Sequence, residues 1–312
     1  MGIILTAVFP LFALILLGFI AGRKKLLGAG AVESLNKFVV WMALPALLFQ
    51  VMANITWDQI NQPGYAAASA LAIAAVFAVS YFTNKRRHGR LADVSLEGLA
   101  ASYANAGYMG FPLCLMVFGE AGLPAVVIAT LLTACVLFAF TIILIEIDLQ
   151  GSGHLLHTMG KVGASVLRNP LVASPLLGAL LALLEWPLPH AIDQFASLLG
   201  AAASPCALVT IGLFLSQNQP TGHAGAVWRI VSLKLLLHPA LAFVLAYWVF
   251  DMPSMWAASA VLLAALPVGT GPFMLATLYN REPAITSRAI LISTVLSVFT
   301  VSLLVAWLNP AG

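Results

Sequence analysis

The chain has 312 residues, of which 62% are hydrophobic and 8% are charged, and its formal net charge is +3. Soluble globular domains carry about 25% charged residues, so this composition excludes a soluble enzyme or a soluble nucleic-acid-binding domain. A mean hydropathy of +1.01 indicates that lipid is the solvent for most of the chain.

Apolar runs follow one another along the whole chain, and a helix needs about 20 such residues to cross a bilayer. The first run, Gly2 to Ile20, precedes the basic residues Arg23 to Lys25, whereas a secretory signal peptide has the opposite order. We therefore expect a first span that enters from outside rather than a cleaved signal. The sequence predicts ten spans, at residues 2–22, 33–53, 63–83, 94–118, 121–147, 161–184, 192–217, 224–249, 255–279 and 284–308.

The charges divide by side in this predicted topology. Loops after the odd-numbered spans hold the basic residues, and the opposite side holds acidic residues only. By the positive-inside rule the basic side is cytoplasmic, which predicts that both termini lie outside. The basic side carries Arg23, Lys24, Lys25, Lys37, Lys85, Arg86, Arg87, Arg90, Lys161, Arg168, Arg229, Arg281 and Arg288, and the opposite side Asp58, Glu120, Glu185, Asp193 and Asp251.

A repeat with an offset of 160 residues runs through the chain. Three proline pairs and a glycine pair keep this offset: Pro10 and Pro170, Pro45 and Pro205, Pro112 and Pro272, and Gly18 and Gly178. One repeat then holds five spans, and an odd number turns the second repeat upside down relative to the first. Inverted repeats of this kind are typical of secondary transporters.

Spans four and nine carry glycine and proline in the middle of an apolar stretch, at equivalent places in the two repeats. Such residues interrupt a helix, and paired interrupted spans point to a transporter binding site. Half-helix N-termini carry partial positive charge and free N–H groups, which suit a carboxylate. The alternative is a pair of ordinary proline kinks. The predicted substrate-binding residues are Asn105, Gly107, Tyr108, Gly110, Phe111 and Pro112 in span four, and Pro267, Gly269, Thr270, Gly271 and Pro272 in span nine.

Lys234 and His238 are the ionisable residues expected deep in the membrane, one helical turn apart on span eight. An intramembrane charge suggests function, and we include both among the candidate binding residues. Lys234 would supply a fixed positive charge and His238 could respond to protons, although Lys234 could also snorkel to the surface and His238 could be structural. With no acid expected at the midplane, an anionic or neutral substrate is favoured. A sodium site would have to be made from backbone carbonyls and from hydroxyl or amide groups such as those of Ser102, Asn105, Thr270 and Thr277.

Three stretches resemble the auxin efflux carrier family in its short bacterial form, which is malonate- or malate-permease-like. They are Leu35 to Phe49, Asn105 to Leu113 with its N-x-G-x-x-G-x-P-L spacing, and Pro267 to Pro272. The resemblance covers essentially the whole chain. The long cytoplasmic loop of the plant members is absent, because only Leu149 to Gly160 joins the halves. Span nine also lacks the asparagine, since position 265 is Ala.

The resemblance implies an all-α fold of ten helices like that of bile-acid symporters and sodium/proton exchangers, with broken spans four and nine crossed. It implies a scaffold from residues 1–58 and 151–220, a mobile transport domain from residues 59–150 and 221–312, elevator-like movement, and a homodimer formed through the scaffold. Asn105, Pro112 and Pro272 would take crossover roles. The substrates implied are auxin in plants and dicarboxylates in bacteria.

The leading hypothesis is a carrier for small organic anions, with H⁺ or Na⁺ as an open choice of coupling ion. No cofactor, metal or nucleic acid is expected, and the partners are the substrate anion, lipid and a second copy of the chain. The runner-up is a sodium-coupled symporter of a bulkier carboxylate. An intramembrane enzyme is a distant alternative, because the only nearby pair of reactive residues is Lys234 and His238 and the sequence offers no matching acid or set of metal ligands. Cys114, Cys135 and Cys206 lie in apolar runs and form no CxxC pair. A receptor would not require paired broken helices.

Overall fold

The computed structural model describes residues 8–28, 30–56, 61–85, 90–150, 168–217, 223–281 and 283–308. Outside them lie Arg86, Arg87, Lys161, most of the segment expected to join the halves, and the starts of the first and sixth predicted spans. Among the described residues, every named element of secondary structure is a helix, and none is a strand. The helices are α1 (Phe9–Arg23), α2 (Ala31–Phe38), α3 (Leu44–Ala53), α5 (Pro63–Lys85), α6 (Leu91–Ser102), α7 (Phe111–Phe118), α8 (Leu123–Leu131), α9 (Phe138–Gln150), α11 (Pro170–Leu183), α12 (His190–Ala201), α13 (Ala203–Ser216), α14 (Ala224–Ser232), α15 (His238–Phe243), α16 (Ser254–Ala264), α17 (Gly271–Leu278) and α18 (Ala284–Leu308).

Several helices continue into one another through π-helical turns, such as Val39–Ala43 between α2 and α3 and Leu233–Leu237 between α14 and α15. Within the described residues, six continuous segments are long and apolar enough to cross a membrane, which makes the chain a multi-pass membrane protein. They are Ala31–Ala53, Pro63–Asn84, Ala106–Leu149, His190–Ser216, Ala224–Val249 and Ala284–Leu308, with shorter apolar helices at Phe9–Arg23, Pro170–Leu183 and Ser254–Ala264.

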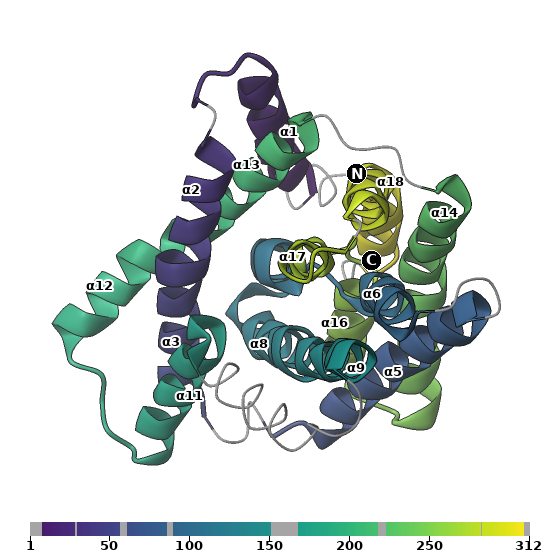
Figure 1. Cartoon of the computed structure of the whole chain (residues 1–312). Coiled ribbons are helices and arrows are strands. Elements are labelled where there is room, and N and C mark those ends of the chain that lie inside the picture. The colour runs from purple at the N-terminus through teal and green to yellow at the C-terminus, as the bar shows by residue number, and fades with distance from the viewer. Residues whose placement is uncertain are drawn as a thin grey trace.

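The helices form two groups, one of which contains α1, α2, α3, α11, α12 and α13 (Figure 1). Two glycines bring helices of this group into backbone contact. A Cβ on Gly18 of α1 would lie 2.2 Å from the carbonyl oxygen of Val209 on α13, and a Cβ on Gly178 of α11 would lie 2.5 Å from that of Phe49 on α3. Small residues allow membrane helices to approach this closely. The pairs α1–α13 and α3–α11 therefore hold the first group together.

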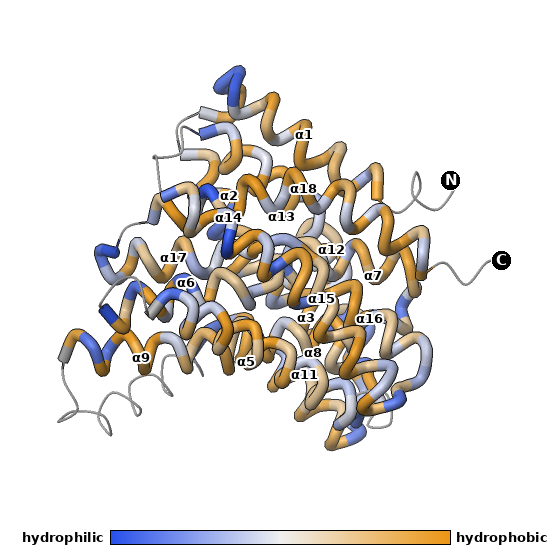
Figure 2. The backbone as a smooth tube through the Cα atoms, turned by 90° about the vertical axis from the view of Figure 1, so that its right-hand side faces the viewer, coloured by the Kyte–Doolittle hydropathy of each residue, from blue (hydrophilic) through white to orange (hydrophobic). Residues whose placement is uncertain are grey.

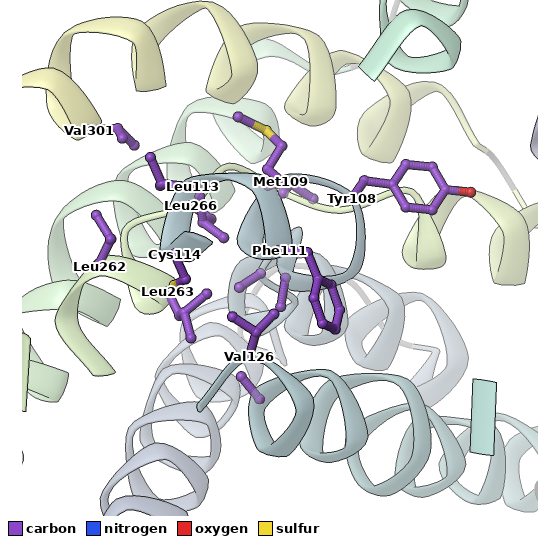
Figure 3. Packing of buried hydrophobic residues seen from close by; sticks show 14 of the residues in the cluster. Tyr108, Met109, Phe111, Leu113, Cys114, Val126, Leu262, Leu263, Leu266 and Val301 are labelled. Atoms are coloured by element: carbon purple, nitrogen blue, oxygen red, sulfur yellow. The ribbon is translucent and has the colours of Figure 1, made fainter. Parts of the chain in front are cut away.

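The second group contains α5 to α9 and α14 to α18, and α17 lies on its side nearest the first group (Figure 1). Its apolar core includes Met109, Leu113, Leu263 and Leu266, which pack together beside Val126 (Figure 3). Met109 and Leu113 belong to predicted span four, and Leu263 and Leu266 belong to predicted span nine. The apolar core therefore supports the two interrupted spans where they meet.

Polar contacts join the ends of helices in the second group, where hydrophilic residues gather while apolar residues run along the helices (Figure 2). Arg281 pairs with Asp93 and Arg229 with Glu97. The hydroxyl of Tyr279 donates to Glu146 at 2.6 Å. The hydrogen bond to Asp93 raises the pKa of Arg281 above its ordinary value, so this guanidinium stays charged. The contacts tie α6, α9, α14 and the end of α17 to one another.

Candidate functional site

Two spans are interrupted, and the interruptions cross. The first runs from Tyr103 to Asn105 between α6 and a π-helical turn, Ala106–Gly110, that leads into α7. The second, residues 265–270, separates α16 from α17. An isolated antiparallel bridge joins Ala104 to Val268. The backbone at this crossing is extended rather than helical.

Hydrogen bonds within the crossing and to α18 satisfy several of its backbone N–H groups. The N–H of Asn105 donates to the carbonyl oxygen of Pro267 at 3.0 Å, and the N–H of Gly269 donates to that of Tyr103 at 3.0 Å. The N–H of Val268 donates to the hydroxyl of Ser293 on α18 at 3.1 Å. Because no water is available to such groups inside a bilayer, these bonds explain how an unwound segment persists there.

The first interruption lies before most of the glycine and proline residues that predicted it. Pro112 sits at the start of α7, behind the π-helical turn, and is buried with Phe111. The π-helical turn before it accommodates this proline inside a continuing helix, because such local adjustments re-satisfy backbone groups that a missing N–H leaves unpaired. Gly110 packs tightly, since a Cβ there would lie 2.9 Å from Leu263. These residues support the crossing from the core side.

The glycines of the second interruption lie against the ring of Tyr103. A Cβ on Gly269 or on Gly271 would lie 2.8 Å from atoms of that ring. Pro272 follows in the first turn of α17, where it is buried. These glycines are therefore required by the close approach of an aromatic side chain.

A cavity of about 290 Å³ lies between the two groups of helices. The first group contributes residues of α2 and α13, and the second contributes residues of the π-helical turn and of α17. Two contacts cross it: the hydroxyl of Tyr108 donates to the side-chain oxygen of Asn36 at 2.6 Å, and the rings of Phe214 and Phe273 meet edge to face at 5.1 Å. The lining residues are Gly30, Val32, Glu33, Asn36, Tyr108, Thr210, Ile211, Phe214, Gln217, Thr270, Phe273 and Met274.

The electrostatics of this cavity come from backbone and neutral polar groups. Among the described residues its lining holds no Lys or Arg, and the acid there, Glu33, is paired with Lys37 at 2.6 Å on the exposed face of α2. Thr270 is the N-cap residue of α17, whose first N–H groups have no partner within the helix. The positive end of that helix therefore points at the cavity. Amide and hydroxyl groups of Asn36, Gln217 and Thr270 add further hydrogen-bonding capacity.

Lys234 and His238 lie on the far side of the crossing and do not line this cavity. Lys234 is fully buried, and its Nζ donates to the carbonyl oxygen of Ala264 at 2.5 Å. His238 lines a separate void of about 20 Å³ that also touches Ala104 and Ala264. Its Nδ1 has no hydrogen-bond partner within the described part of the chain. Both residues thus lie next to the crossing, on the side away from the cavity.

Of the predicted binding residues, Tyr108 and Thr270 line the cavity, while Asn105, Pro267 and Gly269 form the crossing. The hydroxyls suggested for a sodium site are not gathered there: Ser102 donates to the carbonyl oxygen of Gly98 and Thr277 to that of Phe273. Among the described residues, no group of three His, Cys, Asp or Glu side chains could hold a metal ion.

Sequence reasoning missed four residues of the site: Asn36, Tyr103, Phe214 and Ser293. Each lies on a helix or next to an interruption in an otherwise ordinary apolar context. Asn36 falls inside one of the stretches that carry the family resemblance, which was the available signal. The other three are placed by packing between segments distant in sequence.

Comparison with known proteins gives a consistent picture. Residues 3–305 match the family described as "Membrane transport protein". A protein of Rhizobium meliloti (strain 1021) named "Putative malonate transporter" is 30% identical over 302 residues, covering 95% of this chain and 92% of that protein. "Auxin efflux carrier component 8" of Arabidopsis thaliana is 24% identical, covering 95% of each chain. "Uncharacterized transporter YfdV" of Escherichia coli (strain K12) is 25% identical, covering 87% of each.

Proposed function

Because the chain belongs to the membrane transport protein family that includes the auxin efflux carriers, we propose that it is a secondary carrier for small organic anions, mono- or dicarboxylates, in the bacterial inner membrane. The observation that carries the proposal is the crossing of two interrupted helices beside a cavity between two groups of helices. The names of its relatives agree with a carrier rather than an enzyme.

The crossing suits an anion for a physical reason. An anion in the cavity lies next to the positive end of α17 and within reach of amide and hydroxyl donors. The edge-to-face rings of Phe214 and Phe273 and the side chains of Val32 and Ile211 supply an apolar wall for the rest of the molecule. The cavity volume of about 290 Å³ accommodates a molecule with a few carboxylate and carbon groups.

Ten spans in two inverted repeats form part of the proposal. The contact that supports the repeat is between α1 and α13, where Gly18 lies against Val209, and its counterpart between α11 and α3, where Gly178 lies against Phe49. Gly18 of the first repeat corresponds to Gly178 of the second, and Val209 of the second repeat corresponds to Phe49 of the first, each at the offset of 160 residues. The same contact therefore occurs twice, with the glycine once in each repeat. A two-fold relation between the halves produces this reciprocity.

The division of the helices into two groups supports an elevator movement. The first group would be the scaffold, joined to a second copy in a homodimer, and the second would carry the crossing across the membrane. The cavity reaches Gly30, Glu33 and Gln217, which lie next to the basic loops. By the positive-inside rule this arrangement faces the cytoplasm.

The test is uptake into liposomes containing the purified protein. Labelled malonate, malate and indole-3-acetate would each be offered with and without a sodium gradient, a pH gradient and an imposed voltage. We expect saturable uptake of at least one carboxylate and its loss in Asn105→Ala. If none of the three moves under any gradient, the organic-anion assignment is wrong. Wild-type rates in Asn105→Ala at normal expression would remove this residue from the site.

A sodium-coupled symporter of a bulkier carboxylate is the second candidate, and the same assay separates it from the first. It requires uptake that stops when sodium is replaced by choline.

A further inference from the structure

Lys234 occupies a position that the binding of substrate does not explain. It lies in the π-helical turn Leu233–Leu237 of the span that runs from α14 to α15, and none of its surface is exposed. Its Nζ donates to the carbonyl oxygen of Ala264 at 2.5 Å. Snorkelling would carry the ammonium to the helix end, so this geometry excludes that explanation.

The acceptor is the last residue of α16, directly before the second interruption. The last carbonyl groups of a helix have no intrahelical partner and carry partial negative charge. Nearby carbonyls are used by the chain itself, since the N–H of Ala265 bonds Val261 and that of Leu266 bonds Leu263. The ammonium group therefore caps the half-helix at the point where the chain turns into the crossing.

The acidic groups nearest to this position already have basic partners. Helix α6 packs against the turn that holds Lys234, and its acids Asp93 and Glu97 are paired with Arg281 and Arg229. His238 follows one turn later, facing a void that includes Ala264. The group that the structure places against the ammonium is thus a backbone carbonyl at a negative helix end. Such a site attracts a monovalent cation.

We propose that Lys234 is a positioning residue. Its ammonium group takes the place of a bound monovalent cation at the carboxyl end of α16 and thereby fixes the crossing. The carrier then needs no free sodium ion at this position. The substrate anion binds on the opposite face, at the positive end of α17. The role of Lys234 in transport rests on the proposed function. The position of its ammonium at the end of α16 does not depend on which substrate is carried.

Chemical rescue tests the proposal. Lys234→Ala retains the Cβ and removes three methylene groups with the ammonium, so n-propylammonium reproduces the missing part. We expect Lys234→Ala to lose at least tenfold in carboxylate uptake and to melt at a lower temperature. Propylammonium should restore both, methylammonium should do so less well, and the neutral 1-propanol and the bulky tetramethylammonium should do neither.

Two matched variants serve as controls. Lys234→Met fills the space without a charge, and we expect it to be impaired and unresponsive to amines. Lys24→Ala changes an exposed loop lysine and should behave like the wild type in every medium. The proposal is overturned if Lys234→Met transports normally, if 1-propanol rescues Lys234→Ala as well as propylammonium does, or if folded Lys234→Ala responds to no amine.

Should neither variant fold, the wild type decides. Its thermal stability and substrate uptake should be equal in sodium and in choline medium, and a sodium requirement overturns the proposal. The melting temperature of Lys234→Ala in propylammonium also separates this inference from the proposed function. A rise in that temperature, with no carboxylate transported by the wild type, supports the cation site and rejects the organic-anion assignment.

Discussion

Gly269 lies against Tyr103 through both its backbone and its α-carbon. Its N–H donates to the carbonyl oxygen of Tyr103 at 3.0 Å, and a Cβ at position 269 would lie 2.8 Å from two atoms of the tyrosine ring. The ring packs edge to face on Phe138, at 6.3 Å between ring centres. The tyrosine therefore has little room to yield, and the crossing depends on the absence of a side chain at position 269.

Gly269→Ala should destabilise the protein and reduce uptake. Overpacking in a buried, well-packed site costs about 1–3 kcal/mol, and here the strain falls on the crossing itself. Thermal unfolding of the purified variant and uptake per folded molecule would measure the two effects. Gly225→Ala on α14 is the control, because nothing lies within 4 Å of a Cβ there. Equal behaviour of the two variants would contradict the packing argument.

Asn36 and Tyr108 should act as one unit. Their hydrogen bond of 2.6 Å links the proposed scaffold to the proposed transport domain across the cavity. Tyr108→Phe and Asn36→Ala should each alter the apparent affinity for substrate, and the double variant should resemble the single ones. The expected coupling is about 1 kcal/mol, the net contribution of one hydrogen bond, in a double-mutant cycle. Additive effects would show that the two residues act independently.

A reducible cross-link between the two groups should stop an elevator. In a background without the natural cysteines, Asn36→Cys and Tyr108→Cys would be joined by a bifunctional thiol reagent with a cleavable disulfide in its spacer, because a side-chain contact through a tyrosine hydroxyl leaves the two backbones too far apart for a direct disulfide. Uptake would be measured before and after reduction. We expect uptake to stop on cross-linking and to return on reduction. The control pair is Tyr279→Cys and Glu146→Cys, whose parent residues meet at 2.6 Å within the second group. Full transport by the cross-linked 36–108 pair would exclude relative movement at this contact.

Arg229→Gln should be one of the more damaging substitutions outside the site. Arg229 and Glu97 are only 16% and 13% exposed, so removal of the arginine leaves a largely buried carboxylate without its partner. Breaking such a pair costs about 3–5 kcal/mol, whereas Arg229→Gln with Glu97→Gln should recover most of the loss. Thermal unfolding measures both. Lys37→Gln, which breaks an exposed pair, should leave the melting temperature unchanged. If the double variant is no more stable than Arg229→Gln, the buried charge is not the cause.

Much of this protein follows from its sequence. The run of apolar segments predicts a multi-pass membrane protein, because about 20 apolar residues in a helix match the thickness of the bilayer. The stretches Leu35 to Phe49, Asn105 to Leu113 and Pro267 to Pro272 predict the family, which the match over residues 3–305 confirms. The glycine and proline residues of span nine predict its interruption correctly.

The glycine and proline residues of span four predict an interruption there, and the structure places it at Tyr103 to Asn105, at the N-terminal edge of the predicted stretch. Pro112 lies in the helix that follows, behind the π-helical turn Ala106–Gly110. A local pattern gives the residues that can break a helix. Which backbone groups then find partners depends on Pro267 and Gly269, more than 160 residues away, and no local pattern contains that information.

The sequence by itself thus determined the solvent, the family and the helical, multi-pass character of the chain, and it indicated which two spans are interrupted, because hydropathy and the special backbone of glycine and proline are local properties. Only the tertiary structure decided that Tyr103 fills the space over Gly269, that Asn36 meets Tyr108 across the cavity, and that Lys234 caps α16 instead of facing the cavity. The direction of a long side chain inside a membrane is set by which neighbouring carbonyl lacks a partner, and that is a property of the packed helices.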